Sequence, residues 1–145
     1  MRECPRVIVA ATLFCVVAAP AFAADVSVSD GWFRALPSGQ PAGGYFKLKN
    51  IGTAPVSILA ANSPACGMLM LHRSVSSGGT SRMADVEQVS VPPGGAVSFA
   101  PGGYHLMCMS PSAAMAPGKS VPVTLVFSDG SKSQSEFVVK NAAGK

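Results

Sequence analysis

Glycine and proline interrupt this chain at short intervals, and their spacing constrains its fold more than any other sequence feature. The 145 residues include 15 glycines and 12 prolines. They divide the apolar and β-branched residues into runs that recur about every ten residues. No stretch longer than two turns has a convincing helical period, and proline inside a helix removes a hydrogen bond. The pattern is typical of an all-β sandwich or barrel.

The sequence predicts nine strands between these interruptions. They are Val26–Ala35, Gly44–Lys49, Val56–Ala60, Met68–Ser74, Arg82–Val86, Val97–Phe99, His105–Met109, Val121–Phe127 and Gln134–Val139. The segment Ser128-Asp-Gly-Ser131 predicts a hairpin turn between the last two strands, because Gly130 tolerates a positive φ.

The first residues have the character of an export signal. Arg2 and Arg6 precede an apolar run from Val7 to Ala19, and the small-residue cleavage sequence Ala21-Phe-Ala23 follows. The apolar run is too short to span a membrane. We therefore expect an exported protein with no membrane anchor in its mature form. Its parts would be a cleaved signal peptide (1–23), one β-sandwich domain (24–140) and a flexible tail (141–145).

The charge of the chain is small and dispersed. Its 11 Lys and Arg residues and 7 Asp and Glu residues give a formal net charge of +4 at pH 7. Proteins that bind nucleic acid gather basic residues on one face or along one helix. No such cluster is present in the sequence, so nucleic acid is not an expected partner.

Two cysteines, Cys66 and Cys108, remain once the expected signal peptide is removed. An exported protein can form a disulfide, but one pair is not a disulfide framework, and a chain of this length can fold without one. Two small buried apolar side chains are the alternative. Sequence spacing does not define the geometry of a disulfide, so both states stay open.

Both histidines of the chain belong to one pattern with two methionines: His72, Met83, His105 and Met107. The spacing is H-x10-M-x21-H-x-M. Side chains two residues apart share a strand face, so His105 and Met107 are expected to be neighbours. The segment between His72 and Met83 contains Ser-Ser-Gly-Gly, and a hairpin there would bring its two ends together.

Imidazole and thioether ligands, with no carboxylate nearby, favour a soft metal ion of low charge, and Cu(I) fits them best. Cu(I) accepts neutral nitrogen and sulfur donors at low coordination number. Thioethers also suit an oxidising compartment, where thiolates readily become disulfides. The four residues of the pattern are therefore the expected Cu(I) ligands.

Each of these residues, taken singly, has an ordinary structural explanation, since methionines on strand faces usually fill a core. The same holds for Met68, Met70 and Met109, which lie in the methionine-rich stretches around the two histidines. For these three, core packing is the favoured interpretation. A soft surface near the metal is the alternative.

The pattern and its surroundings resemble the periplasmic PCu(A)C (PCuAC) copper chaperone family, whose motif is written H(M)-x10-M-x21-H-x-M. Other segments are similar as well: Asp30-Gly-Trp-Phe-Arg-Ala35, Ala42-Gly-Gly-Tyr-Phe46, Gly94-Gly95 and Pro101-Gly-Gly-Tyr-His-Leu-Met107. The resemblance covers nearly the whole chain after the leader.

The resemblance implies a cupredoxin-like Greek-key β-sandwich that binds Cu(I) through His72, Met83, His105 and Met107. It implies delivery of copper toward the Cu(A) centre of cytochrome c oxidase, with oxidase subunit II or a Sco-type thiol protein as recipient. Ser74 replaces a methionine that is common in the family, and Arg73 is expected to place a cation beside the metal. The His- and Met-rich tail of some members is missing, so no separate Cu(II) site is expected.

Two other classes of protein remain as alternatives. An exported interaction domain would carry these histidines and methionines incidentally. An electron-transfer cupredoxin needs a cysteine ligand beside two histidines, but Cys108 is expected on the opposite strand face from His105. An enzyme is not expected, because no nucleophile or general base has a motif around it. Tyr104 and Trp32 are candidates for packing around the metal.

Overall fold

A computed structural model describes residues 23–145, so the expected signal peptide lies outside the described residues except for Ala23. This part of the chain contains ten strands and one short 3-10 helix. The elements are β1 (Val26–Arg34), η1 (Pro37–Gly39), β2 (Ala42–Asn50), β3 (Val56–Asn62), β4 (Cys66–Ser77), β5 (Thr80–Asp85), β6 (Val89–Val91), β7 (Ala96–Phe99), β8 (Tyr104–Pro111), β9 (Ser120–Phe127) and β10 (Lys132–Lys140). The prediction of an all-β fold is confirmed. None of the helices within residues 23–145 has the length and apolar character needed to cross a membrane.

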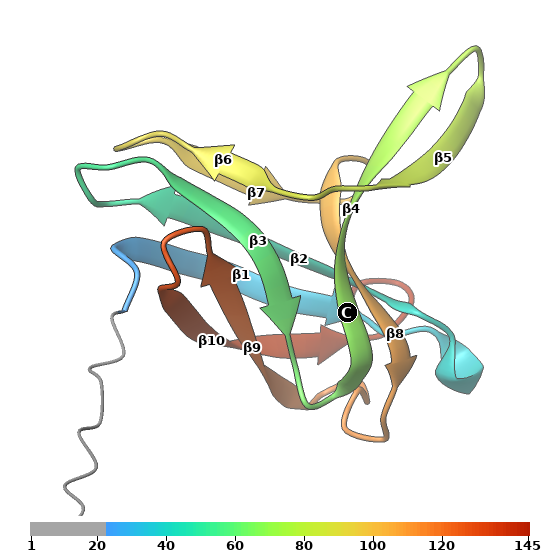
Figure 1. Cartoon of the computed structure of the whole chain (residues 1–145). Helices are drawn as coiled ribbons and strands as arrows, with labels where there is room; N and C mark the ends of the chain where they lie inside the picture. Colours follow the sequence, from blue (N-terminus) through green and yellow to red (C-terminus); the bar gives the residue numbers. More distant parts are fainter. Residues whose placement is uncertain (1–22) are drawn as a thin grey trace, which may run out of the picture.

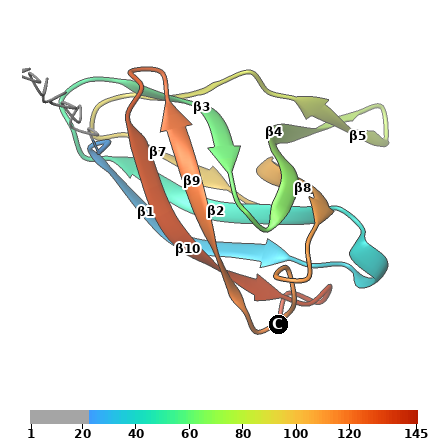
Figure 2. The same ribbon diagram turned by 60° about the horizontal axis from the view of Figure 1, so that its bottom comes forward.

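The strands form one continuous hydrogen-bonded sheet that folds over into the two layers of a cupredoxin-like sandwich (Figure 1). The strand order is β5-β4-β8-β7-β2-β1-β10-β9-β3-β6. Neighbouring strands are antiparallel except for the pairs β1–β10 and β7–β8. Because β3 leads directly into β4, the two halves of the sheet are brought face to face, as the rotated view shows (Figure 2).

The hydrophobic core lies between the two layers, and the alternation of the strands explains its composition. Along β9, every second side chain is buried, from Val121 to Phe127. Phe33, Phe46 and Phe137 meet these side chains, with ring centroids 5.6 Å apart both between Phe33 and Phe137 and between Phe46 and Phe137. Each such buried side chain stabilises the fold by about 1.5–3 kcal/mol.

All nine predicted strands are present, with ends that differ by a few residues. The tenth, β6, was not predicted. It has only three residues, of which Val89 and Val91 are buried and Ser90 is exposed. A single alternation of this kind is too short to be recognised as a period of two.

The predicted turn between β9 and β10 is confirmed. Gly130 has a φ of 81°, which only glycine adopts readily. One carboxylate oxygen of Asp129 accepts hydrogen bonds from the backbone N–H and from the hydroxyl of Ser131. These bonds, that from the hydroxyl first, hold the pKa of Asp129 below its ordinary value because they favour the charged carboxylate.

Cys66 on β4 and Cys108 on β8 form a disulfide, which decides between the two states that the sequence leaves open. Cys108 is fully buried on the core side of β8, as its position one residue after Met107 predicts. The bond joins the two strands that carry His72 and His105.

Replacing both cysteines with alanine should lower the free energy of unfolding by about 2–5 kcal/mol, because the disulfide closes a long loop in the unfolded chain. The sequence separation of the two cysteines is 42 residues. Urea unfolding of the oxidised protein and the variant measures the difference. A loss below about 0.5 kcal/mol would contradict a stabilising role for this bond.

Replacing Asp129 with alanine should destabilise the protein in a way that depends on pH. The folded pKa of Asp129 is lowered, so its contribution is present above the ordinary value of 3.8 and is lost as pH falls below that value. Unfolding midpoints of the two proteins should therefore differ near neutral pH and converge in acid. A difference that is constant with pH would show that the turn does not depend on the carboxylate charge.

Candidate metal centre

The four residues of the H-x10-M-x21-H-x-M pattern project from one face of the β5-β4-β8 part of the sheet. His72 is directly opposite His105, and Met83 is directly opposite Ser74, two residues beyond His72. Directly opposite residues of antiparallel strands point to the same face. Met107 shares this face because it lies two residues after His105.

The β4–β5 hairpin that carries Met83 is the one that the sequence predicts. Gly78 and Gly79 form its tip, with φ values of 58° and 80°. The hairpin extends away from the body of the sandwich (Figures 1 and 2). Met83 is 61% exposed as a result.

His105 is buried and held in one orientation. Its Nδ1 lies 3.1 Å from the carbonyl oxygen of Gly103. A carbonyl only accepts hydrogen bonds, so Nδ1 donates and the lone pair of the neutral ring is on Nε2. Nε2 is buried and has no hydrogen-bond partner. His105 therefore presents the free nitrogen that a metal ion requires.

The His72 ring stands edge-on to the His105 ring, with centroids 5.7 Å apart and an angle of 81° between the planes. A metal ion about 2 Å from one nitrogen of each ring requires centroids roughly 5–6 Å apart. The two rings are thus close enough to share one ion.

Buried polar atoms without partners are concentrated at this site. Among the side chains of residues 23–145, four buried nitrogen or oxygen atoms lack a hydrogen-bond partner. They are Nδ1 and Nε2 of His72, Nε2 of His105 and Nε of Arg34. Folded proteins pair more than about 90% of such groups, and an unpaired one costs about 1–3 kcal/mol. Three of the four atoms belong to the two imidazoles, and each neutral ring has one nitrogen with a lone pair that could bind a metal ion.

Met83, His105 and Met107 line one cavity of about 300 Å³. The remaining lining residues are Arg34, Leu36, Pro41, Gly43, Tyr45, Ser74, Pro101 and Gly102. His72 is not among them and lies beside the cavity, against the His105 ring. Within residues 23–145, no group of three or more His, Cys, Asp or Glu side chains could hold a metal ion. A metal centre at this cavity would therefore depend on thioethers.

The expectation that no carboxylate lies nearby is wrong. Asp85 Oδ1 lies 2.9 Å from His72 Nε2. The two atoms are close but not aligned for a hydrogen bond, since Nε2 has no hydrogen-bond partner. Asp85 is two residues after Met83 in β5, so the period of two that places Met83 also predicts this position. Its side chain is 79% exposed and free to turn toward water.

The prediction that Arg73 places a cation at the candidate centre is wrong, and Arg34 lies there instead. Arg73 is on the opposite strand face, where its guanidinium lies 5.2 Å from the centre of the Tyr104 ring. Arg34 lines the cavity, and its guanidinium lies 5.5 Å from the Trp32 ring and 5.7 Å from the Tyr45 ring. Tyr45 lines the cavity, whereas the predicted Tyr104 and Trp32 do not. A guanidinium disfavours a doubly charged ion more than a singly charged one.

Core packing is the wrong interpretation for two of the three additional methionines. Met68 is 58% exposed and Met109 is 38% exposed. Met70 is half-buried. All three project from the same face as the two histidines, because Met68 is opposite Met109 and Met70 is opposite Met107.

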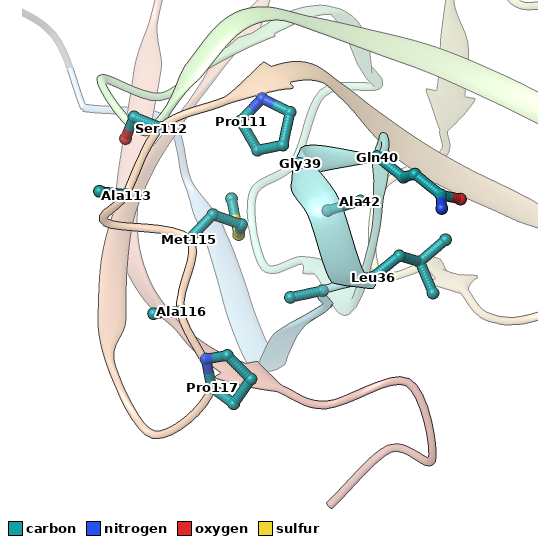
Figure 3. A pocket seen from close by; sticks show the side chains of 11 residues that line it. Leu36, Gly39, Gln40, Ala42, Pro111, Ser112, Ala113, Met115, Ala116 and Pro117 are labelled. Atoms are coloured by element: carbon teal, nitrogen blue, oxygen red, sulfur yellow. The ribbon is translucent and has the colours of Figure 1, made fainter.

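A separate hollow lies between the η1 segment and the loop that follows β8 (Figure 3). Small and apolar side chains line most of it, and the buried Met115 side chain lies among them. Its lining includes no histidine, cysteine or charged residue. Met115 is the one soft donor among the lining residues of this hollow.

Comparison with other sequences identifies a family. The model of the family described as "Putative lipoprotein LpqE-like" matches residues 26–139. A relative described as "Putative lipoprotein Lxx21020", from Leifsonia xyli subsp. xyli, is 36% identical over 120 residues. The match covers 82% of this chain and 72% of the relative.

Solved structures have the same fold. The copper-bound PCuAC domain from PmoF2 superimposes with a TM-score of 0.68 at 21% identity, over 83% of this chain and 96% of that domain. Apo-DR1885 from Deinococcus radiodurans has a TM-score of 0.63 at 26% identity, over 100% of this chain and 99% of that one. Its Cu(I) form has a TM-score of 0.62 at 25% identity, over 86% and 81% of the two chains. The predicted PCuAC resemblance and the cupredoxin-like sandwich are confirmed, and the chain belongs to the LpqE-like family.

Proposed function

We propose that this protein is a periplasmic metallochaperone that binds Cu(I) through His72, Met83, His105 and Met107 and passes it to an acceptor protein. The observation that carries the proposal is a pair of neighbouring imidazoles with buried nitrogens that make no hydrogen bond, beside a cavity lined by two thioethers. The similar fold of copper-bound PCuAC domains supports copper as the cargo.

The charges around the cavity support the singly charged ion. Four neutral ligands leave the complex at +1. The Arg34 guanidinium lines the same cavity and repels a second positive charge. Asp85 offsets part of this repulsion but is exposed to water, where its field is screened. Soft donors and low net charge both favour Cu(I) over Cu(II) and Zn(II).

The ligands differ in how firmly the protein holds them, and this difference suggests a route for transfer. His105 is buried and oriented by the Gly103 carbonyl. Met83 is exposed on the projecting hairpin. An incoming thiolate or imidazole of the acceptor would bind copper as the Met83 sulfur leaves, while His105 stays bound. The copper remains Cu(I) throughout, so the step requires no electron donor or acceptor.

The acceptor is proposed from the family resemblance. It would be subunit II of cytochrome c oxidase, at its Cu(A) centre, or a Sco-type thiol protein. The leader predicted at residues 1–23 supports export to the compartment in which these acceptors are found. The protein would act by binding and transfer and would not be an enzyme.

Electron transfer at a blue-copper centre is less well supported than transfer of the ion. Such a centre needs a cysteine thiolate beside two histidines. Within the described residues, Cys66 and Cys108 are joined in a disulfide, and Cys108 lies on the core side of β8. An interaction domain with incidental histidines would not explain why His105, whose Nε2 is buried without a hydrogen bond, lines the same cavity as two thioethers.

Replacing His105 and Met107 together with alanine should weaken Cu(I) binding at least about hundredfold, or about 2.7 kcal/mol. Competition with a chromophoric Cu(I) chelator measures the affinity. The protein itself should take up one tight equivalent. Met115→Leu is the matched control, because it removes a buried methionine away from the cavity and should leave this affinity unchanged. Failure of the unmodified protein to compete would overturn the proposal.

Replacing Asp85 with asparagine should change Cu(I) affinity by less than about fivefold, since an exposed charged contact is worth at most about 1 kcal/mol. The same chelator competition measures this. A loss near that of the His105/Met107 variant would instead make Asp85 a ligand.

A further inference from the structure

The methionine-rich face continues beyond the candidate metal centre. On the face that carries the His72–His105 pair, the next directly opposite pair of β4 and β8 is Met70 with Met107. The pair after it is Met68 with Met109. The two members of a directly opposite pair point to the same face, and pairs two residues apart along the strands share that face. Three successive cross-strand pairs on this face thus consist of histidine and methionine alone.

Met68, Met70 and Met109 are close enough for their sulfur atoms to meet. Side chains directly opposite one another have Cβ atoms about 4.5–5.5 Å apart. Residues two apart on a strand are separated by roughly 6.5–7 Å. Methionine has three rotatable side-chain bonds, so each sulfur can move several ångströms toward a common point.

Folding alone does not account for this arrangement. Met68 and Met109 are 58% and 38% exposed, so neither fills the core. The core side of the same strands is occupied instead by Leu69, Leu71 and Leu106. The exposed thioethers leave apolar surface in water without a packing partner.

We propose that Met68, Met70 and Met109 form a second site for a soft, singly charged metal ion, a thioether triad that binds Cu(I) or Ag(I). Three neutral sulfur donors select soft ions over Zn(II) and Cu(II). Cys66 and Cys108 are joined in a disulfide, so no thiolate of theirs competes for the ion. The triad has no imidazole and is open to water, so it binds more weakly than the candidate centre. This proposal shares no ligand with the proposed Cu(I) centre and stands independently of it.

The triad also defines a route to the candidate centre. Met70, a member of the triad, is directly opposite Met107. An ion held by Met70 would reach the centre when a bond to the Met107 sulfur forms and the bond to the Met70 sulfur breaks. The ion keeps its charge, and no proton or electron is transferred. The triad would thus bind copper from solution or from a donor protein and pass it to Met107 of the candidate centre.

Titration with Ag(I), which mimics Cu(I) without redox chemistry, tests the triad. Methionine methyl groups labelled with carbon-13 report each sulfur separately by NMR. The first equivalent should shift the methyl signals of Met83 and Met107. The second should shift those of Met68, Met70 and Met109, with an affinity at least about tenfold weaker.

Two variants separate the sites. Met68→Leu/Met70→Leu/Met109→Leu keeps apolar side chains of similar volume and should lose the second equivalent only. His72→Ala/His105→Ala should lose the tight equivalent and keep the shifts of the triad. Triad methyl signals that stay unchanged up to several equivalents of Ag(I) would overturn the triad. If the unmodified protein showed the triad shifts but no tight binding at Met83 and Met107, the proposed function would be overturned and the triad would stand.

Discussion

The antiparallel pairing of β4 with β8 is the interaction on which both the core and the candidate centre depend. Its register places His72 opposite His105 on one face and Leu69 opposite Cys108 on the other. A slip of one residue would exchange the faces, moving the imidazoles into the core and the leucines into water. The Cys66–Cys108 disulfide joins the same two strands. The disulfide therefore links the two strands whose register brings the histidines together.

Local sequence patterns were sufficient for the parts of this site that lie on one strand or one hairpin. The period of two correctly placed Met107 with His105 and put Cys108 on the other face. The glycines after Ser77 correctly predicted the hairpin that carries Met83. In each case the relevant residues are close in sequence, so backbone geometry alone determines their relation.

Residues contributed by distant strands could not be predicted in this way. Arg34 from β1 and Tyr45 from β2 reach the cavity because β2 pairs with β8, which no local pattern reveals. The surface position of Met68 was also missed, because composition does not show which face of β4 is covered. Asp85 is different, because its parity with Met83 predicts a carboxylate on the face of the histidines, contrary to the expectation that none lies nearby. Long-range pairing thus limits what the sequence predicts about the surroundings of the ligands.

X-ray absorption spectroscopy of the protein loaded with one equivalent of Cu(I) tests most directly whether two imidazoles and two thioethers hold one copper ion. This set of ligands predicts two nitrogen and two sulfur neighbours, with an absorption edge characteristic of Cu(I). A shell of nitrogen and oxygen alone would contradict it, because Met83 and Met107 would then not be ligands. A shell of sulfur alone would also contradict it, since His72 and His105 would have no part in binding.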